Sequence, residues 1–387
     1  MSSIRFALLA LLIITPGTFA DSLNCRQVGW CPTYDEATKL RVVGNYAYVA
    51  DYRSGLIIIA VADPTRPCEV GRYDSPGFAY DVELAGDYAL LADYDALRII
   101  SVIDPANPVE VGSYSSPSYA ISVTAFRDTI ALVACSGAGL RLVSFANPAS
   151  PREIGLYYPS PTGYVRAVAV QSDIAFLACG DQGLRIASIT NPSQPEELGA
   201  LATPAFAQSI TVAGRYAYIS CLDQRVRIVD ISNPRAPVLV GEYRFGNHPC
   251  DVATVDSIIY VAASGSGLRV LSVAQPGQPV ELGYYDTPGI SNGAALLGNL
   301  VCIADGNQGM RIIEYLPHGI QELPWEASGR SGTGSSVQTG SSLPENALLA
   351  DATGRIVRPG SVRSGVYFLL EANPGGERRI TRVVLQR

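Results

Sequence analysis

A phrase of about 42 residues returns along most of the chain and constrains its fold more than any other feature. In its clearest copy, Asp223–Tyr243, a short apolar strand (VRIVDI) runs into an Asn-Pro-x-x-Pro turn, and a second strand (VLVGEY) follows. The first residue of that strand recurs in steps of 41 to 44 residues, at Leu56, Leu97, Leu140, Leu184, Val226, Leu268 and Met310. A fixed period of this length indicates a repeat architecture.

Each repeat contains four short strands rich in β-branched residues and separated by Gly, Pro, Asn and Asp. In the second repeat these strands are Tyr80–Gly86, Tyr88–Tyr94, Leu97–Ile103 and Val109–Tyr114. Four strands in about 42 residues are typical of a β-propeller blade, although a solenoid could share the period.

The two ends of the repeat array decide between a ring and a solenoid. The seventh unit, Ser291–Tyr315, has three strands, whereas a spare fourth strand, Cys25–Cys31, precedes the first full repeat. In a closed ring the N-terminal strand completes the last blade and leaves no open edge. We therefore predict an all-β chain in which residues 21–316 form a seven-bladed β-propeller closed by its N-terminal strand.

The repeated phrase also resembles a known family. VRIVDISNPRAP (Val226–Pro237) and LRIASITNPSQP (Leu184–Pro195) are similar to the repeats of the LVIVD-repeat family of bacterial exported propellers. The resemblance covers nearly the whole ring. It implies the fold and export, and it implies little about activity.

The first 20 residues have the pattern of a signal peptide. Arg5 gives a positive start, Phe6–Ile14 is an apolar run of nine, and Thr18-Phe19-Ala20 offers small residues for cleavage. Nine residues are too few to span a bilayer, and no later run approaches about 20, so no transmembrane span is expected in the mature chain. Leu23-Asn24-Cys25 is an alternative, lipoprotein-type site. We expect a secreted or cell-surface protein.

The composition changes after Leu316. Residues 317–342 include a Gly/Ser-rich stretch and are expected to form a flexible linker. Residues 343–387 are expected to form a small β module with strands within Ala347–Val357, Ser364–Ala372 and Arg378–Arg387.

This C-terminal module resembles the sorting module of substrates of the Bacteroidetes type IX secretion system. The matching residues are Asp351–Arg355, Ser364–Phe368 and the last strand, Arg382–Arg387. The resemblance implies that residues 343–387 contact the secretion machinery. A related immunoglobulin-like module that stays attached, or a β appendage without a sorting role, are the alternatives.

The net charge of −7 argues against a nucleic-acid partner, because phosphate binding needs a basic face. An extracellular protein or glycan is the expected partner. An arginine follows the marker residue in every repeat except the first, where Ile57 stands. A ring of these arginines could hold an anion, but we favour pairing of each one with acids or carbonyls of a neighbouring blade, as the planar five-donor group can.

Residues that recur in every blade are expected to be structural, and a site is expected where blades differ. The turn before the first strand of a blade opens onto the central mouth and carries an aromatic residue in five repeats: Tyr34, Phe78, Tyr119, Tyr164 and Phe206. These rings could stack on a sugar or a peptide, or wedge between blades.

The second strands of repeats seven, one and two end in an aspartate: Asp305, Asp51 and Asp93. These three blades are consecutive in a closed ring, so we expect an acidic arc at the same mouth. Carboxylate oxygens suit Ca²⁺ or Mg²⁺, although the chain has no D-x-D-x-D-G calcium loop. Calcium is therefore a possible cofactor at this acidic arc.

Cysteine and histidine give two further candidates. Cys250 opens the first strand of repeat six, beside the end of the second strand of repeat five at Cys221, so Cys221–Cys250 is the predicted disulfide. His248 replaces the usual small residue before a proline and is a candidate ligand residue at the mouth or a surface histidine.

Two functions compete. The chain has no Gly-x-Ser-x-Gly motif, no P-loop and no histidine pair with metal spacing, so no catalytic residue is assigned. The sequence favours a non-enzymatic exported scaffold that binds a protein or glycan at the central mouth. The alternative is a propeller hydrolase or lyase that acts on a sugar or lactone through Asp51, Asp93 and Asp305. The fold by itself does not decide between them.

Overall fold

The secondary structure of the described residues consists of β-strands joined by turns. The structure is a computed structural model that describes residues 22–317, 348–351, 356–357, 365–372 and 378–385. The chain divides into two compact units, residues 1–321 and 322–387. The predicted signal peptide and residues 318–342 of the predicted linker lie outside the described residues.

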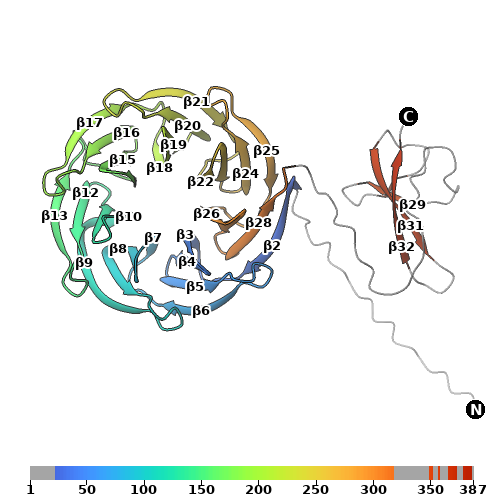
Figure 1. The fold of residues 1–387 in the computed structure, drawn as a ribbon, viewed down its shortest axis with the longest axis horizontal. Helices are drawn as coiled ribbons and strands as arrows, with labels where there is room; N and C mark the ends of the chain where they lie inside the picture. Colours follow the sequence, from blue (N-terminus) through green and yellow to red (C-terminus); the bar gives the residue numbers. More distant parts are fainter. Residues whose placement is uncertain (1–21, 318–347, 352–355, 358–364, 373–377, 386–387) are drawn as a thin grey trace, which may run out of the picture. The chain divides into compact units, whose positions relative to one another are not determined.

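Seven antiparallel sheets form a ring in the first unit (Figure 1). The innermost strands, one for each of blades 1 to 7, are β3 (Ala37–Val43), β7 (Ala79–Ala85), β10 (Ser122–Phe126), β14 (Ala167–Gln171), β18 (Ala207–Ala213), β22 (Asp251–Val255) and β26 (Gly293–Leu297). The second strands are β4 (Tyr46–Asp51), the first part of β8 (Tyr88–Ser101), β11 (Ile130–Ala134), β15 (Ile174–Ala178), β19 (Tyr216–Cys221), β23 (Ile258–Ala262) and β27 (Leu300–Ala304).

The third and fourth strands complete each blade. The third strands are β5 (Leu56–Ala60), the second part of β8, β12 (Leu140–Ser144), β16 (Leu184–Ser188), β20 (Arg225–Asp230), β24 (Leu268–Ser272) and β28 (Met310–Tyr315). The outer strands are β6 (Cys68–Tyr73), β9 (Val109–Ala120), β13 (Arg152–Tyr157), β17 (Glu196–Leu201), β21 (Val238–Arg244), β25 (Val280–Tyr285) and β2 (Cys25–Cys31). In blade 2 the second and third strands of the predicted repeat are thus one 14-residue strand.

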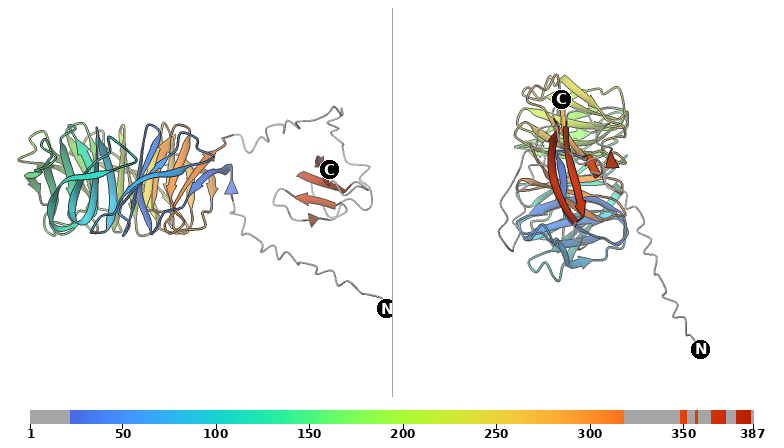
Figure 2. Two further views of the ribbon diagram at one scale, coloured as in Figure 1. Left: turned by 90° about the horizontal axis from the view of Figure 1, so that it is seen from below. Right: turned by 90° about the vertical axis from the view of Figure 1, so that its right-hand side faces the viewer.

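The N-terminal strand closes the ring as predicted. β2 pairs antiparallel with β28, from Cys25 opposite Tyr315 to Cys31 opposite Met310. Figure 2 shows the ring from its edge, with the first strands beside the last ones. The short β1 (Ser22–Leu23) adds a fifth strand to blade 6 by pairing with β25. The prediction of an all-β, seven-bladed propeller is therefore confirmed.

The hydrophobic core lies between blades. Seven clusters of buried side chains each join two adjacent blades, and in one of them Leu56 and Ile58 of blade 1 pack with Val82 and Leu91 of blade 2. Because each sheet is covered on both faces, its strands are apolar without alternation, and Leu56–Ile59 are all 0% exposed. This explains why the repeats contain runs such as LIII.

The repeated glycine of the outer strand is the place where one blade meets the turn of the next. A Cβ on Gly155 would lie 1.9 Å from the carbonyl oxygen of Pro192, in the Asn-Pro turn of blade 4. Gly71, Gly112, Gly199 and Gly241 repeat this contact with the next proline. The ring-closing strand repeats it too, since a Cβ on Gly29 would lie 2.1 Å from the carbonyl oxygen of Pro64 in blade 1. The glycine and the Asn-Pro turn are therefore two halves of one contact between blades.

The repeated arginines pair within their own blade, which corrects the predicted pairing across blades. Arg141 Nη1 lies 3.0 Å from Glu153 Oε1 on the adjacent outer strand. That glutamate also accepts a hydrogen bond from Tyr114 of the preceding blade. Arg185 and Glu197 repeat the pair, with the Tyr157 hydroxyl 2.5 Å from Glu197 Oε2. The neighbouring blade thus contributes a tyrosine, and the arginines have a structural role.

The second unit contains a four-stranded antiparallel sheet in the order β30-β29-β31-β32. The strands are β29 (Leu348–Asp351), β30 (Ile356–Val357), β31 (Gly365–Ala372) and β32 (Arg378–Leu385). The predicted first strand, Ala347–Val357, is therefore two strands. Across the described ranges of both units, no helix is long and apolar enough to cross a membrane.

Candidate functional site

The mouth is the face of the ring where second strands end and first strands begin. The first or second residue after the second strand has a left-handed backbone in six of the seven blades and bridges to the next blade. For example, Tyr52 accepts a hydrogen bond of 2.7 Å from the backbone N–H of Ala79. The six residues are Tyr52, Tyr94, Ser136, Gly180, Ser264 and Gly306.

Two of these left-handed positions hold tyrosine. The φ angles of Tyr52 and Tyr94 are 36° and 59°, in a region that a bulky side chain rarely adopts. Gly180 and Gly306 occupy the equivalent positions of blades 4 and 7, where glycine adopts this backbone without strain. A tyrosine in such a backbone costs about 1 kcal/mol or more, and residues of this kind gather at ligand sites.

The two tyrosines belong to an aromatic cluster on blades 1 to 3, which we define as Tyr52, Phe78, Tyr80, Tyr94 and Tyr119. Tyr52 stacks on Phe78 with ring centroids 4.8 Å apart, and Tyr94 stacks on Tyr119 at 4.3 Å. Phe78 and Tyr80 contact both Tyr52 and Tyr94 and join the two pairs. Tyr119 remains 51% exposed. The cluster therefore offers flat aromatic faces to solvent at one side of the mouth.

The structure divides the five predicted mouth aromatics into three groups. Phe78 and Tyr119 join the cluster, while Tyr164 and Phe206 form a separate edge-to-face pair at 5.7 Å. Tyr34 lies apart, 59% exposed, with the Arg72 guanidinium 4.7 Å from its ring centroid. Sequence reasoning missed Tyr52, Tyr80 and Tyr94. The available signal was the Asp-Tyr pair that ends the second strand in repeats one and two only.

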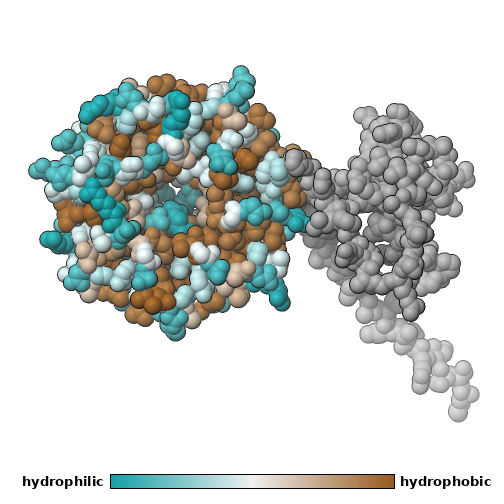
Figure 3. Space-filling view, in the orientation of Figure 1, coloured by the Kyte–Doolittle hydropathy of each residue, from teal (hydrophilic) through white to brown (hydrophobic). Residues whose placement is uncertain are grey.

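A cavity of about 560 Å³ lies inside the ring and is lined mainly by residues of the innermost strands. In space-filling view the ring is hollowed at its centre (Figure 3). Tyr80 lines the cavity and also belongs to the aromatic cluster, so the two features are continuous. Burial, followed by a hydrogen bond with the Tyr52 side chain, raises the pKa of Tyr80 to about 12.

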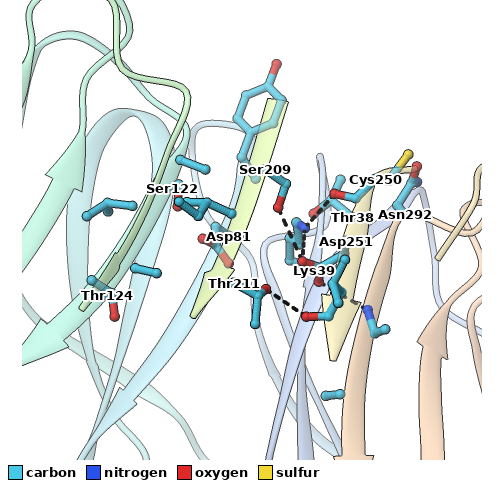
Figure 4. Close-up of a pocket in the computed structure, with 18 of the residues that line it drawn as sticks. Thr38, Lys39, Asp81, Ser122, Thr124, Ser209, Thr211, Cys250, Asp251 and Asn292 are labelled. Atoms are coloured by element: carbon cyan, nitrogen blue, oxygen red, sulfur yellow. Dashed lines mark hydrogen bonds and ion pairs between the residues drawn. The ribbon is translucent and has the colours of Figure 1, made fainter. Parts of the chain in front are cut away.

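Charged side chains in the cavity are mostly paired. Lys39 Nζ lies 2.8 Å from Asp251 Oδ1, and the two side chains point toward each other in Figure 4. Arg41 Nε lies 3.2 Å from Glu83 Oε2, and its Nη2 lies 3.9 Å from Asp81 Oδ1. Both aspartates also accept backbone N–H groups of the next blade. These pairs link innermost strands to one another.

The three predicted mouth aspartates are 0% exposed, each within its own blade. Asp51 Oδ2 accepts the backbone N–H groups of Tyr34 and Asp35, both at 2.9 Å. Asp93 and Asp305 accept the N–H of Gly77 and Gly289 and pair with Arg98 and Arg311. Their carboxylates hold the turn before the first strand and are not presented to a ligand. Within the described residues, no three His, Cys, Asp or Glu side chains form a cluster suited to a metal ion.

The predicted Cys221–Cys250 disulfide is absent, since both residues are free thiols. Cys221 is 0% exposed in the core between blades 4 and 5, whereas Cys250 faces the central cavity. The two side chains thus point to different sides of the ring. Burial raises the pKa of both thiols above the ordinary value. His248 is half-buried, its carbonyl faces the Cys250 thiol, and it does not line the cavity.

Solved structures of similar fold share little sequence with this chain. The chain is similar to the RRP9 WD40 repeats (13% identity, TM-score 0.61), covering 76% of this chain and 99% of that chain. U3-55K gives 13% identity and a TM-score of 0.60, covering 75% of this chain and 98% of that one. The computationally designed Ika8 protein gives 9% and 0.55, covering 74% and 98%. Likeness at this level shows the fold alone.

Comparison with curated proteins gives no match. A family model described as the LVIVD repeat matches residues 36–75, 76–116, 162–203, 206–244, 247–287 and 288–314. The matched segments correspond to six of the seven blades, and the unmatched blade 3 has the same four strands. Because the matches cover more than half of the chain, the protein belongs to the LVIVD repeat family.

Proposed function

We propose that the protein is a binding scaffold that takes an extracellular glycan or protein ligand at the mouth of its central cavity, on the aromatic cluster. The observation that carries the proposal is the pair of tyrosines in left-handed backbone, Tyr52 and Tyr94. Six blades share this backbone and two of them place glycine there, so the ring does not require the strained tyrosines of blades 1 and 2. These tyrosines present stacked aromatic faces beside a cavity, and binding a ligand on those faces would explain why they are there.

The test is binding of the full-length protein to glycan and peptide arrays, repeated with Tyr119→Ala. Tyr119 is the most exposed ring of the cluster and supports no part of the core. Loss of one aromatic contact of about 1.4 kcal/mol corresponds to about tenfold weaker binding. Leu222→Ala is the matched control, because Leu222 is 46% exposed and follows the second strand of blade 5. Unchanged binding by Tyr119→Ala would contradict the proposal.

We also propose that the chain is exported and that residues 343–387 are recognised by a secretion machinery. The pattern of residues 1–20 and the motif residues of the C-terminal segment support this. Deletion of residues 343–387 is expected to stop delivery to the cell surface, measured by surface labelling of the tagged protein. Normal surface delivery of the truncated protein would refute the sorting role.

A further inference from the structure

Arg166 lines the cavity and differs from the other cationic side chains there. Its guanidinium makes no hydrogen bond and no ion pair with any described residue. Lys39 and Arg41, which line the same cavity, are both paired with carboxylates. The remaining carboxylate of the wall, Glu36, accepts a hydrogen bond of 3.0 Å from Asn292, between blades 7 and 1. Arg166 belongs to blade 4 and has no share in these pairs.

Arg166 follows Val165, the residue of blade 4 that bridges to Ser136 of blade 3, and every blade has a residue at the equivalent position. The seven cavity-lining residues at this level are Thr38, Tyr80, Ile121, Arg166, Gln208, Cys250 and Asn292. Arg166 is the only charged member of this set. Thr38 and Asn292 donate to backbone carbonyls, at 3.0 Å to Ala79 and 3.2 Å to Ala37. The mouth level of the cavity therefore carries one unpaired positive charge.

Arg166 lines the same cavity as Tyr80 of the aromatic cluster and follows closely on Tyr164 of the second aromatic pair. Its charge acts on the Tyr80 hydroxyl of the aromatic cluster and opposes the rise of that pKa. Tyr164 precedes Arg166 by two residues and contacts Phe206. A ligand that extends from the aromatic cluster into the cavity thus enters the space that Arg166 also lines.

We propose that the mouth binds an acidic saccharide, with a sugar carboxylate on the Arg166 guanidinium and a sugar ring stacked on the aromatic cluster. This inference rests on the proposed function and narrows its ligand class. The planar fork of arginine matches a carboxylate with two parallel hydrogen bonds. A partly buried guanidinium without a partner is costly, and a carboxylate ligand supplies the partner. A cavity of about 560 Å³ is in the range of small-ligand pockets.

The test uses matched pairs of acidic and neutral saccharides with the full-length protein. Galacturonic acid trimer is compared with its methyl ester, and sialyllactose with lactose, by isothermal titration calorimetry. We expect at least one acid to bind about tenfold or more tightly than its neutral partner, with the preference falling as salt rises. Arg166→Gln should abolish the preference by weakening the acid alone, and Arg166→Lys should keep part of it.

Arg152→Gln is the matched control, since Arg152 is exposed on the outer strand β13, and it should leave both ligands unchanged. Thermal melting of each variant reports whether the ring is intact. Equal binding of acid and neutral partner, both weakened by Tyr119→Ala, would overturn this inference and leave the proposed function standing. Binding of peptides alone, or of no saccharide, would overturn it as well. Saccharide affinity that is unchanged in the Tyr119→Ala variant would overturn the proposed function instead.

Discussion

At the residue scale, the Asp-Pro and Asn-Pro turns make the same backbone N–H hydrogen bond with and without a titrating group. Asp63 Oδ1 accepts the N–H and hydroxyl of Thr65 at 3.0 and 2.6 Å. Asn191 and Asn233 accept the equivalent backbone N–H groups, from Ser193 at 3.3 Å and from Arg235 at 3.2 Å. These side chains fix the turns that receive the glycine of the preceding blade.

This equivalence predicts a change in acid stability. Hydrogen bonds from Thr65 and from Asn107 are the main causes that lower the pKa of Asp63 and of Asp104. A lowered pKa means that stability is present above about pH 4, where the unfolded carboxyl is ionised, and is lost as the pH falls through the folded-state pKa. Asp63→Asn with Asp104→Asn should be slightly less stable than the wild type at pH 7, because the amide cannot accept the hydrogen bonds that Arg66 and Asn107 donate to Oδ2 of the aspartates. The double variant should lose less stability than the wild type between pH 4 and pH 2.

Urea unfolding at several pH values measures this difference. The conservative variant Asp128→Asn is the control, because Asp128 is exposed and lies outside the Asp-Pro turns. A double variant that loses as much stability in acid as the wild type would show that the two carboxylates do not contribute.

The candidate site was only partly predictable at the residue scale. The proline-aromatic turns identified Phe78 and Tyr119, because their place before the innermost strand sets them at the mouth. Tyr52 and Tyr94 were missed because their role depends on a left-handed backbone after a strand, which side-chain patterns do not reveal. Asp51, Asp93 and Asp305 were assigned to the mouth surface from their position in the strand. Their side chains turn inward because they accept backbone N–H groups of the turn that precedes the first strand of the same blade.

At the scale of the strand, the repeated glycine explains why the period is so regular. Each outer strand has a register shift beside this glycine, as between Leu142 and Val143 opposite Gly155. The shift brings the backbone against the turn of the next blade. The glycine series was visible in the sequence, but its cause was not, because the contact joins residues of different repeats.

The steric contact predicts that a single methyl group weakens the interface between blades. Gly155→Ala should lower the free energy of unfolding by about 1–3 kcal/mol, because the added Cβ overlaps a backbone carbonyl that cannot rotate away. Gly137→Ala is the control, since a Cβ there meets nothing within 4 Å. Both changes are measured by urea unfolding, and equal effects of the two variants would argue against this role of the glycine.

At the scale of the whole molecule, the ring was predictable because the missing strand at one end of the array matched the spare strand at the other. Removal of residues 22–31 should therefore open the ring. It leaves β28 without its partner and removes Cys25 and Cys31 from the two clusters that flank blade 7. A loss of several kcal/mol lowers the melting temperature by about 10 °C in a domain of this size.

Deletion of residues 343–387 is the matched control for this truncation, because those residues belong to the second compact unit. The melting temperature of the ring should then stay within a few degrees of the wild type. A ring that melts at an unchanged temperature without residues 22–31 would show that closure by β2 does not stabilise it.

The ligand site of the whole ring is harder to predict than its fold, because the repeats that build the ring differ at few positions. The central claim is that the left-handed tyrosines are kept for a ligand. Tyr94→Gly and Ser136→Gly change the same position in blades 2 and 3, and glycine accepts both backbones without strain. The dissociation constant of the tightest array ligand is measured for both full-length variants by calorimetry. The account predicts binding about tenfold weaker for Tyr94→Gly, with its melting temperature preserved, and unchanged binding for Ser136→Gly. Equal affinity of Tyr94→Gly and the wild type would contradict it.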